Sequence, residues 1–146
     1  MRVRSKVLVA LVAGVMAFAT VAPAGASAPK LKLRLIEFKI TPARDFIAAG
    51  KTTFVAKNAG SDKHEVVVVA GDDPAALPTK ADGSVDEKQV DVVGEIHKFK
   101  PGKTGSKVFK LSPGSYIVFC NIVQKEKHSA LESHFKKGMY ATIEAS

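Results

Sequence analysis

The chain has 146 residues, of which 46% are hydrophobic, and a formal net charge of +8. Its basic residues are dispersed among strand-like segments without the aromatic interleaving that single-stranded nucleic acid prefers, which argues against a nucleic-acid-binding protein. A moderately basic surface is the simplest interpretation of the charge, and an acidic protein partner or an anionic cell surface is the more specific one.

The first 26 residues predict a secretory signal peptide. The basic start MRVRSK precedes a 16-residue apolar run, Val7 to Ala22, and the small residues PAGASA supply a cleavage site after Ala26. An uncleaved anchor is the alternative, but the run is short of the ~20 residues that a spanning helix needs. No cysteine lies directly after this apolar run, so no residue there could carry the lipid of a bacterial lipoprotein. We therefore expect an exported protein, located in the periplasm, on the cell surface or outside the cell.

Cleavage would leave residues 27–146, a single domain of 120 residues with 19 basic and 14 acidic residues, or about +5. We expect no membrane span in it and a monomer. Its one cysteine excludes an intramolecular disulfide. A free thiol in an oxidising compartment must be buried, paired between chains or bound to a metal.

Residues 31–40 alternate apolar and charged side chains, as a half-buried strand does. The alternation changes phase between Leu35 and Ile36, which predicts a bulge or a change of sheet there. Strands are also expected over residues 52–57 and in the β-branched run that begins at His64.

The rest of the chain continues this pattern. Residues 71–89 are rich in Asp, Pro and Gly and predict a long polar loop, and several short strands follow, separated by turns at Pro101-Gly102, Gly105 and Pro113-Gly114. Short strands with frequent turns predict an all-β sandwich or barrel.

Residues 116–140 contain the only cysteine, two of the four histidines and one of the three methionines. Cysteine, histidine and methionine together suggest a soft-metal site. Each has a simpler interpretation by itself: a surface turn for His64, a buried apolar thiol for Cys120 and a core side chain for Met139. His97 fits no motif position and is expected on the surface.

Three segments, NAGSDKHEVVVV, PGSYIVFCNI and HFKKGMYATIEA, resemble the site-bearing segments of cupredoxins, the plastocyanin-like type 1 copper proteins. The resemblance covers most of the mature chain and implies a Greek-key β-sandwich or barrel of the cupredoxin type. It also implies one copper ion per chain, held by His64, Cys120, a histidine of the last loop and Met139. Two imidazoles, a thiolate and a weak axial thioether form a blue-copper centre, for which zinc is the chief competitor.

The last loop departs from the family pattern, in which the second histidine usually follows the cysteine by two to four residues. Here 13 residues separate Cys120 from His134, and seven separate it from His128. His134 is the expected ligand, because the stretch from His134 to Met139 reproduces the family's His-x-x-x-Gly-Met. The SALE stretch, residues 129–132, resembles a capping box and predicts a short helical turn that ends at Gly138.

The resemblance implies an exported one-electron carrier that serves redox partner proteins and is not an enzyme. No Ser/His/Asp arrangement, phosphate loop or second metal cluster occurs in the sequence. A copper carrier that delivers the ion to an exported oxidase, or a metal-free β-sandwich interaction domain, remains an alternative.

Overall fold

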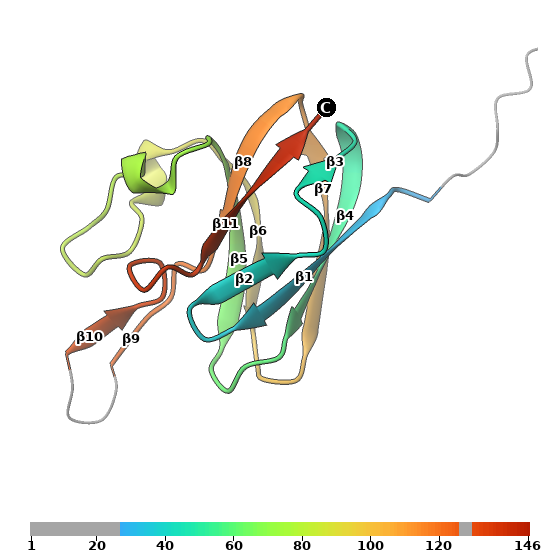
Figure 1. The fold of residues 1–146 in the computed structure, drawn as a ribbon. Helices are drawn as coiled ribbons and strands as arrows, with labels where there is room; N and C mark the ends of the chain where they lie inside the picture. Colours follow the sequence, from blue (N-terminus) through green and yellow to red (C-terminus); the bar gives the residue numbers. More distant parts are fainter. Residues whose placement is uncertain (1–26, 126–129) are drawn as a thin grey trace, which may run out of the picture.

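The computed structural model describes residues 27–125 and 130–146, which form a sandwich of two β-sheets (Figure 1). One sheet has the order β2-β1-β4-β7, with bounds Lys39–Pro42, Lys30–Ile36, Gly50–Asn58 and Thr104–Leu111. The other has the order β3-β11-β8-β5-β6, with bounds Phe46–Ile47, Tyr140–Ala145, Gly114–Phe119, His64–Ala70 and Val92–Phe99. The predicted all-β Greek-key sandwich is confirmed.

The phase change near Leu35 is a hairpin turn, so the predicted bulge or change of sheet is wrong. Strand β1 ends at Ile36, which pairs with Lys39 of β2, and Glu37-Phe38 form the two-residue turn between them. Phe38 has a φ of 60°, a left-handed conformation that is uncommon for a non-glycine residue. Without Gly, Asn or Asp at either position, the sequence lacked the usual hairpin signal.

Strand β5 is buried on both faces, which accounts for its run of four valines. Val66 and Val68 face the core between the sheets, whereas Val67 and Val69 belong to a second apolar cluster with Val85. The predicted loop after Gly71 supplies Val85 and contains two 3-10 turns, η1 (Pro74–Ala76) and η2 (Glu87–Gln89). This loop therefore covers the outer face of the second sheet.

One predicted turn is also wrong. Gly105 lies inside β7, where a Cβ atom on it would meet Ile96 Cγ2 at 2.5 Å. The glycine is therefore required by close packing against β6 and does not mark a turn. The turn at Pro101-Gly102 is present, and no helix within residues 27–125 and 130–146 is long and apolar enough to cross a membrane.

The described residues between Cys120 and His134 contain two paired strands, so the predicted turn that ends at Gly138 does not begin within residues 131–133. Strands β9 (Val123–Lys125) and β10 (Leu131–Ser133) pair antiparallel and extend from the sandwich (Figure 1). A turn follows only at residues 134–138, where the Ser133 hydroxyl accepts a hydrogen bond from the Lys136 amide at 3.2 Å. Cross-strand pairing overrides the local capping pattern.

Candidate metal centre

Three segments that are distant in sequence bring His64, Cys120 and His134 together. His64 begins β5, Cys120 follows β8, and His134 follows β10. Strands β5 and β8 pair antiparallel, so the start of β5 lies beside the end of β8. The Cys120 Sγ atom lies 4.0 Å from His64 Nδ1 and 3.4 Å from His134 Nδ1, and the three ligand atoms are within 4.8 Å of one another.

The arrangement suits a metal that accepts nitrogen and sulfur ligands. All three side chains are buried, and both imidazoles turn Nδ1 toward the sulfur. The Nε2 atoms of both histidines are buried and have no hydrogen-bond partner among the described residues. An imidazole that binds a metal through Nδ1 carries its proton on Nε2. Two imidazole nitrogens and one thiolate in this arrangement are the equatorial donor set of a blue-copper site.

Met139 is buried in the same cluster of core side chains as Cys120. Its backbone connects two of the three cluster residues: the Met139 amide donates to the His134 carbonyl at 3.0 Å, and the Cys120 amide donates to the Met139 carbonyl at 3.1 Å. Gly138 precedes it with a φ of 96°, a conformation that favours glycine. The backbone therefore places Met139 next to both Cys120 and His134.

The β9–β10 ribbon restores a short connection between cysteine and histidine. The His134 amide donates to the carbonyl of Ile122 at 2.9 Å, and Ser133 pairs with Val123. Strands β9 and β10 pair with each other, so His134 lies beside a residue only two positions after Cys120. His128, the alternative ligand, lies outside the described residues.

Burial keeps the three side chains uncharged when no metal is bound. It raises the pKa of the Cys120 thiol to about 12, although the backbone amides of Glu65 and Ile122 act in the opposite direction. Burial also lowers the pKa of His64 and of His134 below the ordinary value. A metal ion must therefore displace the thiol proton, whereas the imidazoles are already neutral.

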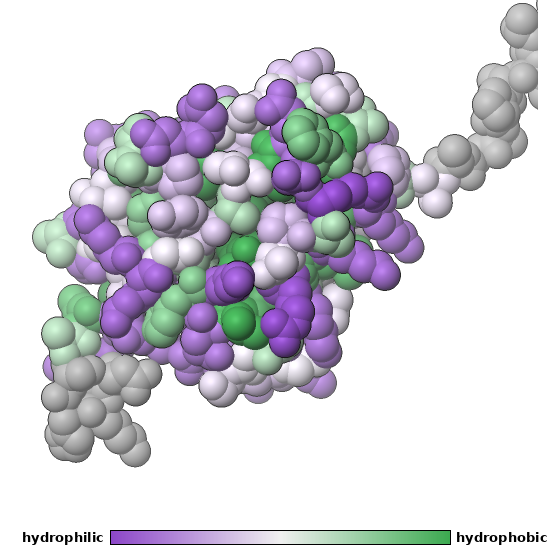
Figure 2. Space-filling model, in the orientation of Figure 1, coloured by the Kyte–Doolittle hydropathy of each residue, from purple (hydrophilic) through white to green (hydrophobic). Residues whose placement is uncertain are grey.

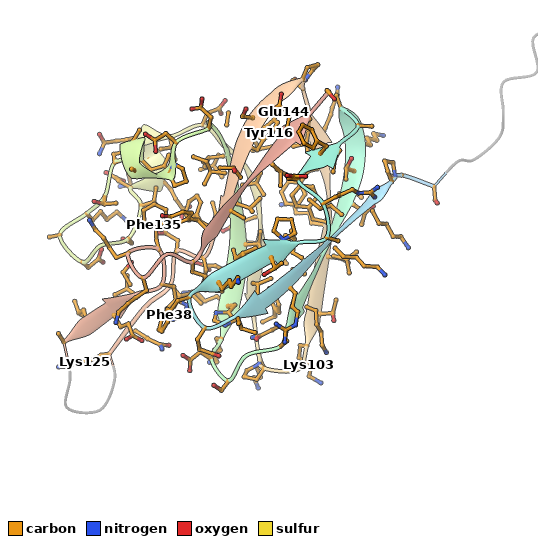
Figure 3. The ribbon with its side chains drawn as sticks, in the orientation of Figure 1. Phe38, Lys103, Tyr116, Lys125, Phe135 and Glu144 are labelled. Atoms are coloured by element: carbon orange, nitrogen blue, oxygen red, sulfur yellow. The ribbon has the colours of Figure 1, made fainter. Side chains whose placement is uncertain are left out.

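The β1–β2 turn supplies contacts to both histidines that the sequence did not indicate. Glu37 Oε1 lies 3.7 Å from His64 Nε2, and the Phe38 ring packs edge-on against His134 with a centroid separation of 5.6 Å. Lys137 Nζ lies 5.5 Å from the centroid of the Phe38 ring. Figure 3 shows Phe38 at the end of the β1–β2 hairpin, beside the loop that precedes β11. The phase change at Leu35 was the only signal for this turn.

Asn121 was also missed, although it directly follows Cys120. Its Oδ1 atom accepts from the Val85 amide at 2.6 Å, and its Nδ2 atom donates to the Val85 carbonyl at 3.0 Å and to Glu87 Oε1 at 2.7 Å. This side chain therefore connects the cysteine segment to the loop that covers the second sheet. His97 is exposed, as expected, and pairs with Glu95 at 3.0 Å.

No family model and no curated protein matches the sequence. Solved structures do match. Auracyanin from Roseiflexus castenholzii is 19% identical, with 84% of this chain and 99% of that chain covered and a TM-score of 0.58. Azurin iso-2 from Methylomonas sp. strain J is 16% identical, with coverages of 82% and 99% and a TM-score of 0.55. Auracyanin A from Chloroflexus aurantiacus, described as a "blue" copper protein, is 16% identical, with coverages of 80% and 99% and a TM-score of 0.51. The chain has the cupredoxin fold, as the three segments predicted.

Proposed function

We propose that this protein is an exported, single-domain copper protein that carries one electron at a time through a type 1 site. His64, Cys120 and His134 would hold the ion, and Met139 would be the weak axial ligand. The observation that carries the proposal is the meeting of two imidazole Nδ1 atoms and one thiol in a buried cluster. The cupredoxin fold supports it, because auracyanin A, which shares that fold, is a blue copper protein.

The chain's own residues would keep the site rigid. Bound copper supplies a couple, Cu(II)/Cu(I), that changes by one electron. Thiolate and thioether suit Cu(I), and imidazole suits both states. Because His64 begins a strand and the Met139 backbone bonds to both the Cys120 and the His134 segments, the donors have little freedom to rearrange. A rigid site that changes little between oxidation states favours electron transfer.

Burial favours this function over delivery of copper to another protein. His64, Cys120 and His134 have no exposed surface, and Phe38 packs against His134. A carrier must open this packing to release its ion, whereas an electron can leave without it. The metal-free interaction domain has less support, because it gives no reason for two unpartnered buried imidazole nitrogens beside a thiol.

The location and the partners are part of the proposal. Residues 1–26 would direct export and be removed, which leaves a basic monomer that meets redox partners, acidic ones in particular. In Figure 2 the hydrophilic side chains are spread over the visible face. No enzymatic activity of its own is proposed.

The test is addition of Cu(II) to purified residues 27–146. We expect uptake of one ion per chain and an intense visible thiolate-to-copper band with a reversible one-electron wave. Cys120→Ser should give a folded, colourless protein, and Zn²⁺ should occupy the wild-type site without colour. Absence of both copper uptake and the band in the wild type would refute the proposal, and a band that persists in Cys120→Ser would refute the ligand assignment.

A further inference from the structure

The outward nitrogen of His64 lacks a hydrogen-bond partner but faces a carboxylate. His64 Nε2 is buried, accepts or donates no hydrogen bond among the described residues, and lies 3.7 Å from Glu37 Oε1. If Nδ1 binds copper, as the proposed function requires, Nε2 must carry the ring proton. A buried N–H without an acceptor costs about 1–3 kcal/mol. A small approach of the two groups would therefore form a charge-assisted hydrogen bond.

The backbone around residues 60–62 fixes the position of the Glu37 carboxylate. Glu37 Oε1 accepts hydrogen bonds from the backbone amides of Ser61 and Asp62, the latter at 2.9 Å. These amides belong to the loop that leads into His64, so one oxygen atom contacts both the loop and the ligand. A Cβ atom on Gly60 would meet Glu37 Oε1 at 2.3 Å. Only glycine at position 60 leaves room for the carboxylate in this place.

The surroundings of Glu37 favour its negatively charged form, because two backbone N–H groups donate to one of its carboxylate oxygens. Asp62 acts on the His64 ring with the same sign as Glu37, and its carboxylate accepts a hydrogen bond from Gln124 Nε2 at 2.9 Å. A fixed anion on the far side of a ligating imidazole makes that ligand a stronger donor and favours the more highly charged metal.

We propose that Glu37 is a positioning residue that accepts the Nε2–H of His64 and biases the site toward Cu(II). It would fix the ring orientation so that Nδ1 faces Cys120, and its charge would lower the reduction potential. Carboxylates that orient metal-bound histidines typically change metal affinity by about 10–100-fold when they are mutated. Because Cu(II) gains more from the anion than Cu(I), the two affinities should change unequally.

The test is Glu37→Gln, since a glutamine Oε1 can still accept from the Ser61 and Asp62 amides while the charge is lost. We expect copper uptake and the visible band to remain. The ratio of Cu(II) to Cu(I) affinity should fall about tenfold, which is a rise in potential of about 59 mV for one electron. Glu144→Gln is the control for net charge, because Glu144 lies near the far end of β11 and its carboxylate accepts a hydrogen bond from Ser115 Oγ at 3.3 Å (Figure 3).

A potential in Glu37→Gln that moves no further than in Glu144→Gln would overturn the proposal. If the wild type takes up no copper, the proposed function fails and this inference fails with it; wild-type uptake with an unchanged Glu37→Gln potential refutes the inference alone. A second measurement does not depend on the variant folding. In the NMR spectrum of the wild-type Cu(I) protein, the His64 Nε2–H signal should be shifted strongly downfield, and a signal at the position of an unbonded imidazole N–H would also overturn the proposal.

Discussion

Replacement of Asn121 by alanine should destabilise the metal-free protein by about 2–4 kcal/mol. Asn121 is the hydrogen-bond partner of both the amide and the carbonyl of Val85, a fully buried residue. Alanine would leave both backbone groups without a partner, at about 1–3 kcal/mol for each buried group. Some water would enter beside them, so the lower part of the summed range is expected. The bond to Glu87 adds less, because that carboxylate is partly exposed.

The measurement is urea unfolding of the metal-free protein at pH 7. The free energies of unfolding are compared for variants whose free energy depends equally on urea concentration. Gln89→Ala is the matched control. It removes an amide that donates to Asp86 Oδ2 at 2.7 Å on the exposed side of the same loop, and it should cost no more than about 0.5 kcal/mol. A loss below about 1 kcal/mol for Asn121→Ala would show that the loop is held by its valines and not by Asn121.

Three further predictions concern the site itself. His134→Ala should abolish the visible copper band, whereas His128→Ala should leave the spectrum intact. The reverse result would make His128 the ligand in place of His134. Met139→Leu should keep copper and colour but raise the reduction potential measured by voltammetry, because a poorer axial donor stabilises Cu(II) less; an unchanged potential would make Met139 a core residue only. The Cys120 thiol has a pKa of about 12 in the fold and ionises near 9 when unfolded. Its contribution to stability is therefore complete below pH 9 and lost as pH rises toward 12, by at most about 1.4 kcal/mol per pH unit. In alkaline urea titrations metal-free wild type should lose stability relative to Cys120→Ser, and parallel curves would contradict this.

The candidate site residues could be predicted from sequence because they lie in three segments that resemble the site-bearing segments of cupredoxins, each next to the start or end of a strand. His64 follows a Gly- and Asp-containing turn, Cys120 ends a buried apolar run, and Met139 follows a glycine. These patterns survive folding because they report turns and buried strands directly. The sandwich itself followed from the same signals.

The contacts around the candidate site could not be predicted, because they depend on which strands pair. The Glu37-Phe38 turn has no turn-forming residue, so its phase change was equally compatible with a bulge. Ser129 and Glu132 match a capping box, but a local helix signal of this size is weaker than the pairing of β9 with β10. Asn121 gave no pattern at all, since its partner Val85 is 36 residues away.

The backbone hydrogen bond between Ile122 and His134 divides the chain into a part near the candidate site, where changes of length are not tolerated, and a part farther out, where they are. Because this bond and the pairing of β9 with β10 hold the two ends together, the segment that joins the two strands can be lengthened while the distance from Cys120 to His134 stays the same. The cost of a longer ribbon end is only the slow logarithmic growth of loop-closure entropy. The ribbon is thus a place where a tag, a fluorophore or a partner-binding peptide could be carried close to the metal centre without entering it.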